Sequence, residues 1–306
     1  MTAPVMTDQL ASPKKTKAAE AKENLTSKWA TAAAIIIAAL WTIPTIGLFM
    51  TSLVPGDLYR TESWWNVALD GKLTFENFGY VLFSSFGDSS SAPPLLGNLI
   101  NAIVVTVPTT VFPLVIGLMA AYAFAWIPFR GSNFLFVFIF ALQVVPLQLA
   151  LIPLLKILGP QGIGIAGQFP GVWVAHTIFA MPLAVFLLHN FIAQIPSDII
   201  EASRVDGASH TQIFFRIIIP LSLPALASLA IFQFLWVWND LLVSAVFGSI
   251  KTYTLTYPIS NLAGNYGATA YLVPAAAFVS MVIPLIVFFS LQRYFVRGLL
   301  AGSTKG

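Results

Sequence analysis

Long stretches without any charged side chain constrain this chain most. Six of them lie at residues 29–53, 89–129, 131–155, 157–197, 217–239 and 252–292, and only 9% of the 306 residues are charged, against about 25% in soluble domains. A bilayer core about 30 Å thick needs about 20 apolar helical residues, and lipid offers the backbone no hydrogen-bond partner. Three stretches therefore hold one membrane-spanning helix each, and the three of 41 residues each hold a helix and a loop.

The sequence thus predicts an all-α integral membrane protein with six transmembrane helices. We place them at 29–50, 97–126, 133–157, 170–193, 222–247 and 272–295. A cleaved signal peptide is the rival interpretation of the first span. However, its apolar run exceeds 20 residues and is not closed by a small-residue cleavage pattern, so we expect an uncleaved span.

Basic residues predict the orientation. If residue 1 is cytoplasmic, 11 basic residues fall inside: Lys14, Lys15, Lys17, Lys22, Lys28, Arg130, Arg204, Arg216, Arg293, Arg297 and Lys305. Four fall outside: Arg60, Lys72, Lys156 and Lys251. The positive-inside rule favours this arrangement, so we expect both termini in the cytoplasm of a prokaryotic cell and the chain in its plasma (inner) membrane.

Composition argues against several other classes. The net charge of +3 follows topology and forms no patch for nucleic acid. Without cysteine there is no thiolate metal site. His176, His189 and His210 lack metal-ligand spacing, so we expect them to pack or to form hydrogen bonds, and we predict no metal site and no catalytic residue.

The remaining segments are a tail, an outer loop and several proline breaks. Residues 1–28 are polar and lysine-rich, which predicts a disordered tail.

The segment 51–96 carries Trp64, Trp65 and an aromatic patch at Glu76–Phe78, and we interpret its aromatic residues as interface anchors. Prolines are expected to bend the spans: Pro44, Pro108, Pro113, Pro146, Pro153, Pro182 and Pro284.

The segment 196–220, between the fourth and fifth spans, predicts two short helices. Pro196–Asp198 is read as an N-terminal cap followed by a first-turn acid. Gly207 is a natural corner, because glycine tolerates a positive φ. Ser209 and Gln212 form a capping-box pattern that restarts the helix. Pro220 and Pro224 then mark entry into the fifth span.

A few polar residues fall within the predicted spans. Asp240, next to Asn239, is the one carboxylate inside a predicted helix, and a charge at mid-bilayer costs on the order of 3 kcal/mol. It either makes a helix–helix contact with a partner chain or forms part of a polar path across the membrane. Gln143, Gln148 and Gln233 either bind a solute or form interhelical hydrogen bonds. The candidate translocation path comprises Gln143, Gln233, Asn239 and Asp240.

The run Glu201-Ala202-Ser203, Gly207, Ile217 and Pro220 resembles the EAA loop of binding-protein-dependent ABC importer permeases. The chain departs from the usual form at Ser203, where the family has Ala, and at Ile219, where it has Leu. Further segments resemble carbohydrate permeases of the MalG type: 74–78, 121–124, 129–131, 145–146 and 152–154. The ending 292–306 is similar to the α-glucoside and maltose members.

The resemblance implies a transmembrane domain at 29–297 that pairs with a second homologous permease and is served by an extracytoplasmic sugar-binding protein. An ATPase dimer would hold ATP and Mg, because the chain contains no phosphate-binding loop of its own. The implied ATPase-coupling residues are Glu201, Ala202, Ser203, Asp206, Gly207, Ala208, Ile217 and Pro220. A C-terminal tail at 298–306, with Gly302, Ser303 and Lys305, would reach the ATPase; its glycines predict a flexible chain.

Two other functions are open to such a chain. An ion-coupled secondary transporter usually has ionisable residues near the midplane, and only Asp240 qualifies. A membrane-embedded enzyme would need a nucleophile–base pair or a metal motif, which this sequence does not contain.

The predicted orientation can be tested with single cysteines. Cysteines at Ser12 and Ser303 should resist a membrane-impermeant thiol reagent in intact cells, whereas one at Ser90 should react. Labelling of either terminal cysteine in intact cells would contradict this topology.

Overall fold

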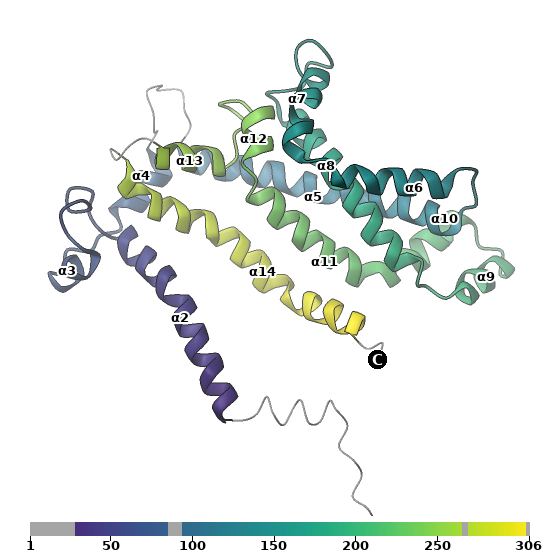
Figure 1. Cartoon of the computed structure of the whole chain (residues 1–306), viewed down its shortest axis with the longest axis horizontal. Helices are drawn as coiled ribbons and strands as arrows, with labels where there is room; N and C mark the ends of the chain where they lie inside the picture. Colours follow the sequence, from purple (N-terminus) through teal and green to yellow (C-terminus); the bar gives the residue numbers. More distant parts are fainter. Residues whose placement is uncertain (1–27, 85–93, 265–268, 304–306) are drawn as a thin grey trace, which may run out of the picture.

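The computed structural model, described over residues 28–84, 94–264 and 269–303, consists of helices joined by short connections (Figure 1). Among the described residues, five helical segments are long and apolar enough to cross a membrane, and a sharply bent pair makes a sixth if it counts as one span. This confirms the predicted all-α class. The long helices are α2 (Lys28–Ser52), α5 (Leu95–Trp126), α8 (Phe169–Ile192), α11 (Ile219–Trp238) and α14 (Val273–Ser303).

The third predicted span is broken, and the bend expected at Pro146 is sharp enough to divide residues 133–157 between two helices. Helix α6 (Ser132–Ala141) and the 3-10 turn η1 (Leu142–Val144) meet α7 (Leu147–Leu158) at 107°. Pro146 causes the break, because the residue before a proline is pushed out of the helical region. Val145 accordingly has an extended backbone, with φ −69° and ψ 120°.

The fifth predicted span is displaced. Its helical run begins at His210, with α10 (His210–Ile213) and the π-helical η2 (Phe214–Ile218), and ends at Trp238. Asp240 therefore lies beyond the span, which corrects its placement inside a helix at 222–247. The segment after it forms a separate short helix, α12 (Leu242–Phe247).

Four long helices pack side by side. Helix α5 packs against α8 and α11, and α11 also packs against α14. Small residues bring α5 and α8 close: a Cβ added at Gly117 would lie 3.1 Å from the Cβ of Ala184, as is common where membrane helices meet. Helix α2 diverges from the others towards its N-terminal end (Figure 1). It contacts α14 through Phe49 and Phe278, whose rings are 5.2 Å apart.

Proline-freed carbonyls join these four helices. A proline inside a helix cannot donate to the carbonyl four residues earlier. Pro108, Pro113 and Pro284 thus leave the carbonyls of Val104, Thr109 and Ser280 without their regular donors. Each of these carbonyls accepts a side-chain N–H from a neighbouring helix: Val104 from Trp173 (3.0 Å), Thr109 from Gln233 (3.2 Å) and Ser280 from Trp238 (3.0 Å).

The ends of the bundle differ. One end carries α3 (Trp64–Leu69), α4 (Glu76–Phe83) and α13 (Thr256–Gly264), and the other carries α9 (Ser197–Val205) and α10 (Figure 1). Of the aromatic residues interpreted as interface anchors, Trp65 is exposed and Trp64 and Phe78 are partly buried, whereas Asn77 beside Phe78 is buried. The predicted disordered tail lies outside the described residues, except for Lys28, which begins α2. Helix α14 continues through Gly298 and Gly302 to Ser303, where the glycines had predicted flexible chain.

Asn77 links α4 to the end of α2 by two hydrogen bonds. Its Nδ2 donates to the carbonyls of Ser52 (3.0 Å) and Val54 (2.8 Å). Replacing Asn77 by Ala should destabilise the protein by about 2 kcal/mol, because two buried acceptors lose their donor. Thermal unfolding in detergent should show a lower midpoint. The exposed Asn66 is the control, and an Asn66→Ala midpoint that falls as far would contradict this account.

Candidate functional site

The predicted corner between two short helices forms at Gly207. Helix α9 ends in a pair of hydrogen bonds typical of a left-handed C-terminal turn: Ala208 N–H donates to Ser203 O (2.9 Å), and Gly207 N–H donates to Arg204 O (3.0 Å). Gly207 has φ +81°, with open space where a side chain would begin. Only glycine adopts this backbone without strain, so the sequence fixes the corner.

The restart of the helix follows the predicted capping box. Ser209 N–H donates to Gln212 Oε1 (2.8 Å), and Gln212 N–H donates to Ser209 Oγ (3.3 Å). The helix then runs without interruption through η2 into α11. In a π turn, each carbonyl accepts from the N–H five residues later instead of four. This pattern is compatible with Pro220, which has no N–H to donate to the carbonyl of Arg216.

The start of α9 differs from the prediction. Asp198 is the expected first-turn acid, but the N-cap position is occupied by Pro196, which has no side-chain group to accept a hydrogen bond from the first turn. Ser203, where the family pattern has Ala, donates its hydroxyl to Ile199 O (2.7 Å) within its own helix. The departure at Ser203 therefore leaves the helix intact.

One apolar cluster anchors the loop to the long helices. Ile200, Ile213 and Ile218 are each at most 1% exposed and pack with Leu188 of α8 and Tyr122 of α5. Two polar contacts reinforce this packing: the Tyr122 hydroxyl and His210 Nδ1 are 2.9 Å apart, and Arg204 Nη2 donates to Trp126 O (3.2 Å). His210 thus forms a hydrogen bond, as expected. The loop is therefore held against α5 and α8 by apolar packing and two polar contacts.

The outward face of the loop carries most of the predicted coupling residues. Glu201, Ala202, Asp206, Gly207 and Pro220 are exposed, and Ser203, Ala208 and Ile217 are partly buried. Two apolar side chains stand out beside them, Val205 (86% exposed) and Phe215 (62% exposed). Exposed apolar groups next to charged residues, on a loop packed against the long helices, form a surface suited to a protein partner. Of the predicted tail residues, Gly302 and Ser303 end α14, and Lys305 lies outside the described residues.

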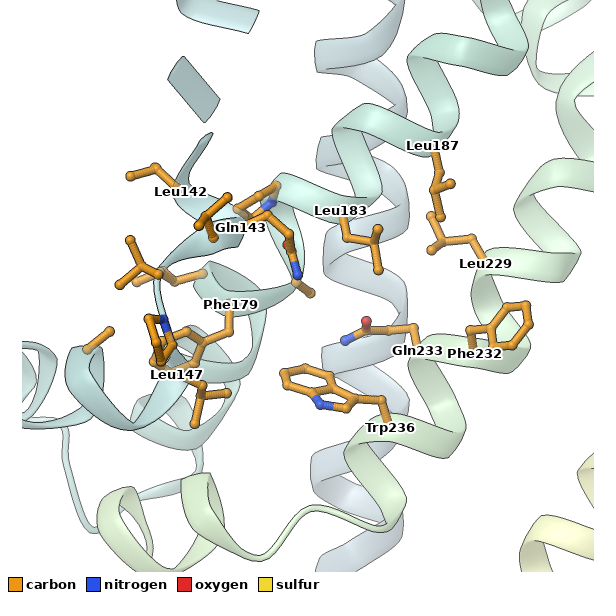
Figure 2. A pocket seen from close by; sticks show the side chains of 17 residues that line it. Leu142, Gln143, Leu147, Phe179, Leu183, Leu187, Leu229, Phe232, Gln233 and Trp236 are labelled. Atoms are coloured by element: carbon orange, nitrogen blue, oxygen red, sulfur yellow. The ribbon is translucent and has the colours of Figure 1, made fainter. Parts of the chain in front are cut away.

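A cavity of about 820 Å³ lies where the broken span faces α8 and α11 (Figure 2). The break itself supplies one wall, from Leu142 to Leu147, and α8 and α11 supply the others. Two of the four predicted path residues line it, Gln143 and Gln233. None of the described residues that line it is charged, so the cavity suits a neutral ligand.

The aromatic side chain of Trp236 shares the cavity wall with Gln233. The two residues are one helical turn apart on α11 and project toward the broken span (Figure 2). Behind Trp236 lies His176, which is 1% exposed and meets the indole edge-on at a centroid distance of 5.3 Å. His176 thus packs, as expected, against a residue of the cavity wall.

The other two predicted path residues do not line the cavity. Asn239 Nδ2 donates to Leu235 O (2.7 Å). Asp240 Oδ2 accepts the N–H groups of Val243 (2.9 Å) and Ser244 (3.3 Å), so it caps α12. Burial raises the pKa of Asp240, and the hydrogen bonds from the first turn of α12 act against that rise. This carboxylate therefore has a structural role.

Sequence reasoning missed Trp236 and the support behind it. The signal for Trp236 was present: it follows Gln233 by three residues, and such residues share a helix face. His176 had no comparable signal, because its contact with Trp236 depends on how α8 and α11 pack.

The chain matches known proteins over most of its length. Residues 113–300 match the family model described as binding-protein-dependent transport system inner membrane component. The osmoprotective compounds uptake permease protein GgtD of Synechocystis is 48% identical, covering 89% of this chain and 90% of that protein. The alpha-glucoside transport system permease protein AglG of Rhizobium meliloti is 49% identical, over 77% of this chain and 61% of that protein.

Solved structures share the fold. A chain of a bacterial ABC transporter that imports the acidic polysaccharide alginate superimposes with a TM-score of 0.65 at 20% identity, covering 93% of this chain and 100% of that one. The MetNI methionine ABC transporter gives a TM-score of 0.51 at 20% identity, over 67% of this chain and 95% of that one. With a family model that matches more than half of its residues, this chain belongs to the family of binding-protein-dependent transport system inner membrane components.

Proposed function

We propose that this chain is the permease subunit of an ATP-driven importer for a neutral sugar, an α-glucoside such as maltose or a related oligosaccharide. It would form the translocation path together with a second homologous permease. An ATPase dimer, which binds ATP and Mg, would dock on the exposed face of the 196–220 loop, and an extracytoplasmic binding protein would deliver the sugar. Both termini would lie in the cytoplasm.

One observation carries this proposal: the second half of the 196–220 loop, from His210 onward, and one wall of the cavity belong to a single continuous helix. The run from His210 to Trp238 begins at the capped corner and ends just past Gln233 and Trp236. A displacement of the loop by an ATPase would therefore move one wall of the cavity. Alternating access needs such a mechanical connection between the site of ATP hydrolysis and the solute path.

The uncharged lining of the cavity and the names of two related permeases support the choice of substrate. The lining residues are uncharged, and one relative is named as an alpha-glucoside permease. An osmoprotective compound, as named for another relative, would fit the same cavity if it is a neutral, hydroxylated solute. An ion-coupled transporter is less well supported, because Asp240, its one candidate carboxylate, caps α12.

The corner at Gly207 provides a test of coupling. Gly207→Val must hold a β-branched residue at a positive φ, which costs about 1–2 kcal/mol or moves the second helix. Glu201→Lys would reverse the exposed charge next to the corner. Each variant should lower the ATPase activity stimulated by the loaded binding protein by about tenfold, since about 1.4 kcal/mol corresponds to tenfold. The measurement is ATP hydrolysis by the reconstituted complex.

Gly131 is a matched control for the corner. It has φ +84°, also with open space around its Cβ position, but it is the N-cap residue that precedes α6 and does not join the coupling helices. Gly131→Val should therefore strain the backbone to a similar degree and leave ATPase stimulation close to normal. Normal abundance together with wild-type sugar transport in both Gly207→Val and Glu201→Lys would refute the coupling role.

The substrate is tested by deletion. A strain that lacks this chain should lose uptake of an α-glucoside such as radiolabelled maltose, and the full-length chain supplied in trans should restore it. If α-glucoside uptake stays normal and uptake of another class of solute is lost, the substrate assignment is wrong.

A further inference from the structure

The amide of Gln233 is fixed in one orientation. Its side chain is 7% exposed, and its Nε2 donates to the carbonyl of Thr109 on the neighbouring α5. The same side chain lines the cavity (Figure 2). Because the donor end of the amide is held by α5, the residue can offer its acceptor, Oε1, to a ligand.

Pro113 is the reason that the Thr109 carbonyl is available. In an uninterrupted helix, the N–H of residue 113 would bond to this carbonyl, and Gln233 would have to compete with it. Proline has no N–H to donate. The buried carbonyl therefore needs a partner from outside its own helix, and Gln233 supplies it.

Trp236 completes the same wall. Its indole is backed by the buried His176, and its position one turn from Gln233 puts an aromatic surface next to the amide acceptor. The less polar face of a pyranose ring can pack on an aromatic side chain, while its hydroxyls point to hydrogen-bonding groups at the rim.

We propose that Gln233 is a specificity-determining residue that accepts a hydrogen bond from one sugar hydroxyl during passage, oriented from behind by the carbonyl that Pro113 frees. Trp236 packs against the ring of the same sugar unit. This deepens the proposed function and rests on it. It predicts that a proline outside the cavity lining sets how the importer ranks closely related sugars.

The test compares maltose with its monodeoxy analogues. The complete importer is reconstituted in liposomes, and transport is measured at saturating loaded binding protein, so that discrimination by that protein does not enter. The wild type should transport one monodeoxy analogue about fivefold more slowly than maltose, as expected for one lost hydrogen bond of about 1 kcal/mol. Gln233→Met keeps the length of the side chain without its amide and should bring this ratio close to one.

Two proline variants separate orientation from simple loss of packing. Pro113→Ala restores a helix donor to the Thr109 carbonyl, which frees the Gln233 amide to turn, and should also reduce the ratio toward one. Pro108→Ala is the matched control: it restores the donor to Val104, whose side-chain partner is Trp173 instead of a cavity residue. Its ratio should stay at the wild-type value.

A double variant serves as the control for loss of folding. If Gln233→Met alone is unstable because Thr109 loses its partner, adding Pro113→Ala supplies a new one and should restore abundance without restoring discrimination. An unchanged ratio in Gln233→Met or Pro113→Ala, or an equal loss in Pro108→Ala, would overturn the inference. A wild-type complex that transports no α-glucoside would refute the proposed function instead.

Discussion

The hydrogen bond from a neighbouring side chain to a proline-freed carbonyl is the interaction on which this bundle depends. In lipid, a backbone acceptor without a donor costs several kcal/mol, so a carbonyl that a proline leaves without its regular donor is stabilised by a donor from another helix. Trp173 supplies this donor between α8 and α5, Gln233 between α5 and α11, and Trp238 between α11 and α14. These three contacts run in sequence across the four packed helices.

This arrangement explains how bent helices can still be held in register. Apolar packing between membrane helices is weakly specific, because lipid tails satisfy an apolar side chain as well as another helix does. A freed carbonyl accepts a hydrogen bond only from a donor at one position along the neighbouring helix. The bond therefore sets the position of one helix relative to the next. At Gln233 the same requirement orients a residue that faces the cavity, which links the stability of the bundle to one of the few polar groups in the cavity wall.

The sequence predicted well what depends on local chemistry. Charge-free stretches predicted five spans, and most of the predicted ends lie within a few residues of the observed ones. Gly207 predicted the corner, and the Ser209–Gln212 pair predicted the restart of the second helix. Prediction failed where a boundary depends on contacts across the fold. Asp240 looked like a carboxylate within a span, because its role as a cap for α12 is visible only once that helix is known to be separate. The strength of the break at Pro146 was also hidden, since most prolines in these spans remain inside continuous helices.

Those two failures concern the features that form the site. A straight third span would place Gln143 on a continuous helix surface, whereas the 107° break turns the segment from Leu142 to Leu147 into a wall of the cavity. A fifth span that began at residue 222 would separate the coupling helices from that wall. The helix instead begins at the capping box of Ser209. A displacement of the exposed corner is therefore transmitted along one continuous helix that contains Gln233. The same departures from simple hydropathy therefore create both the cavity and its mechanical connection to the loop.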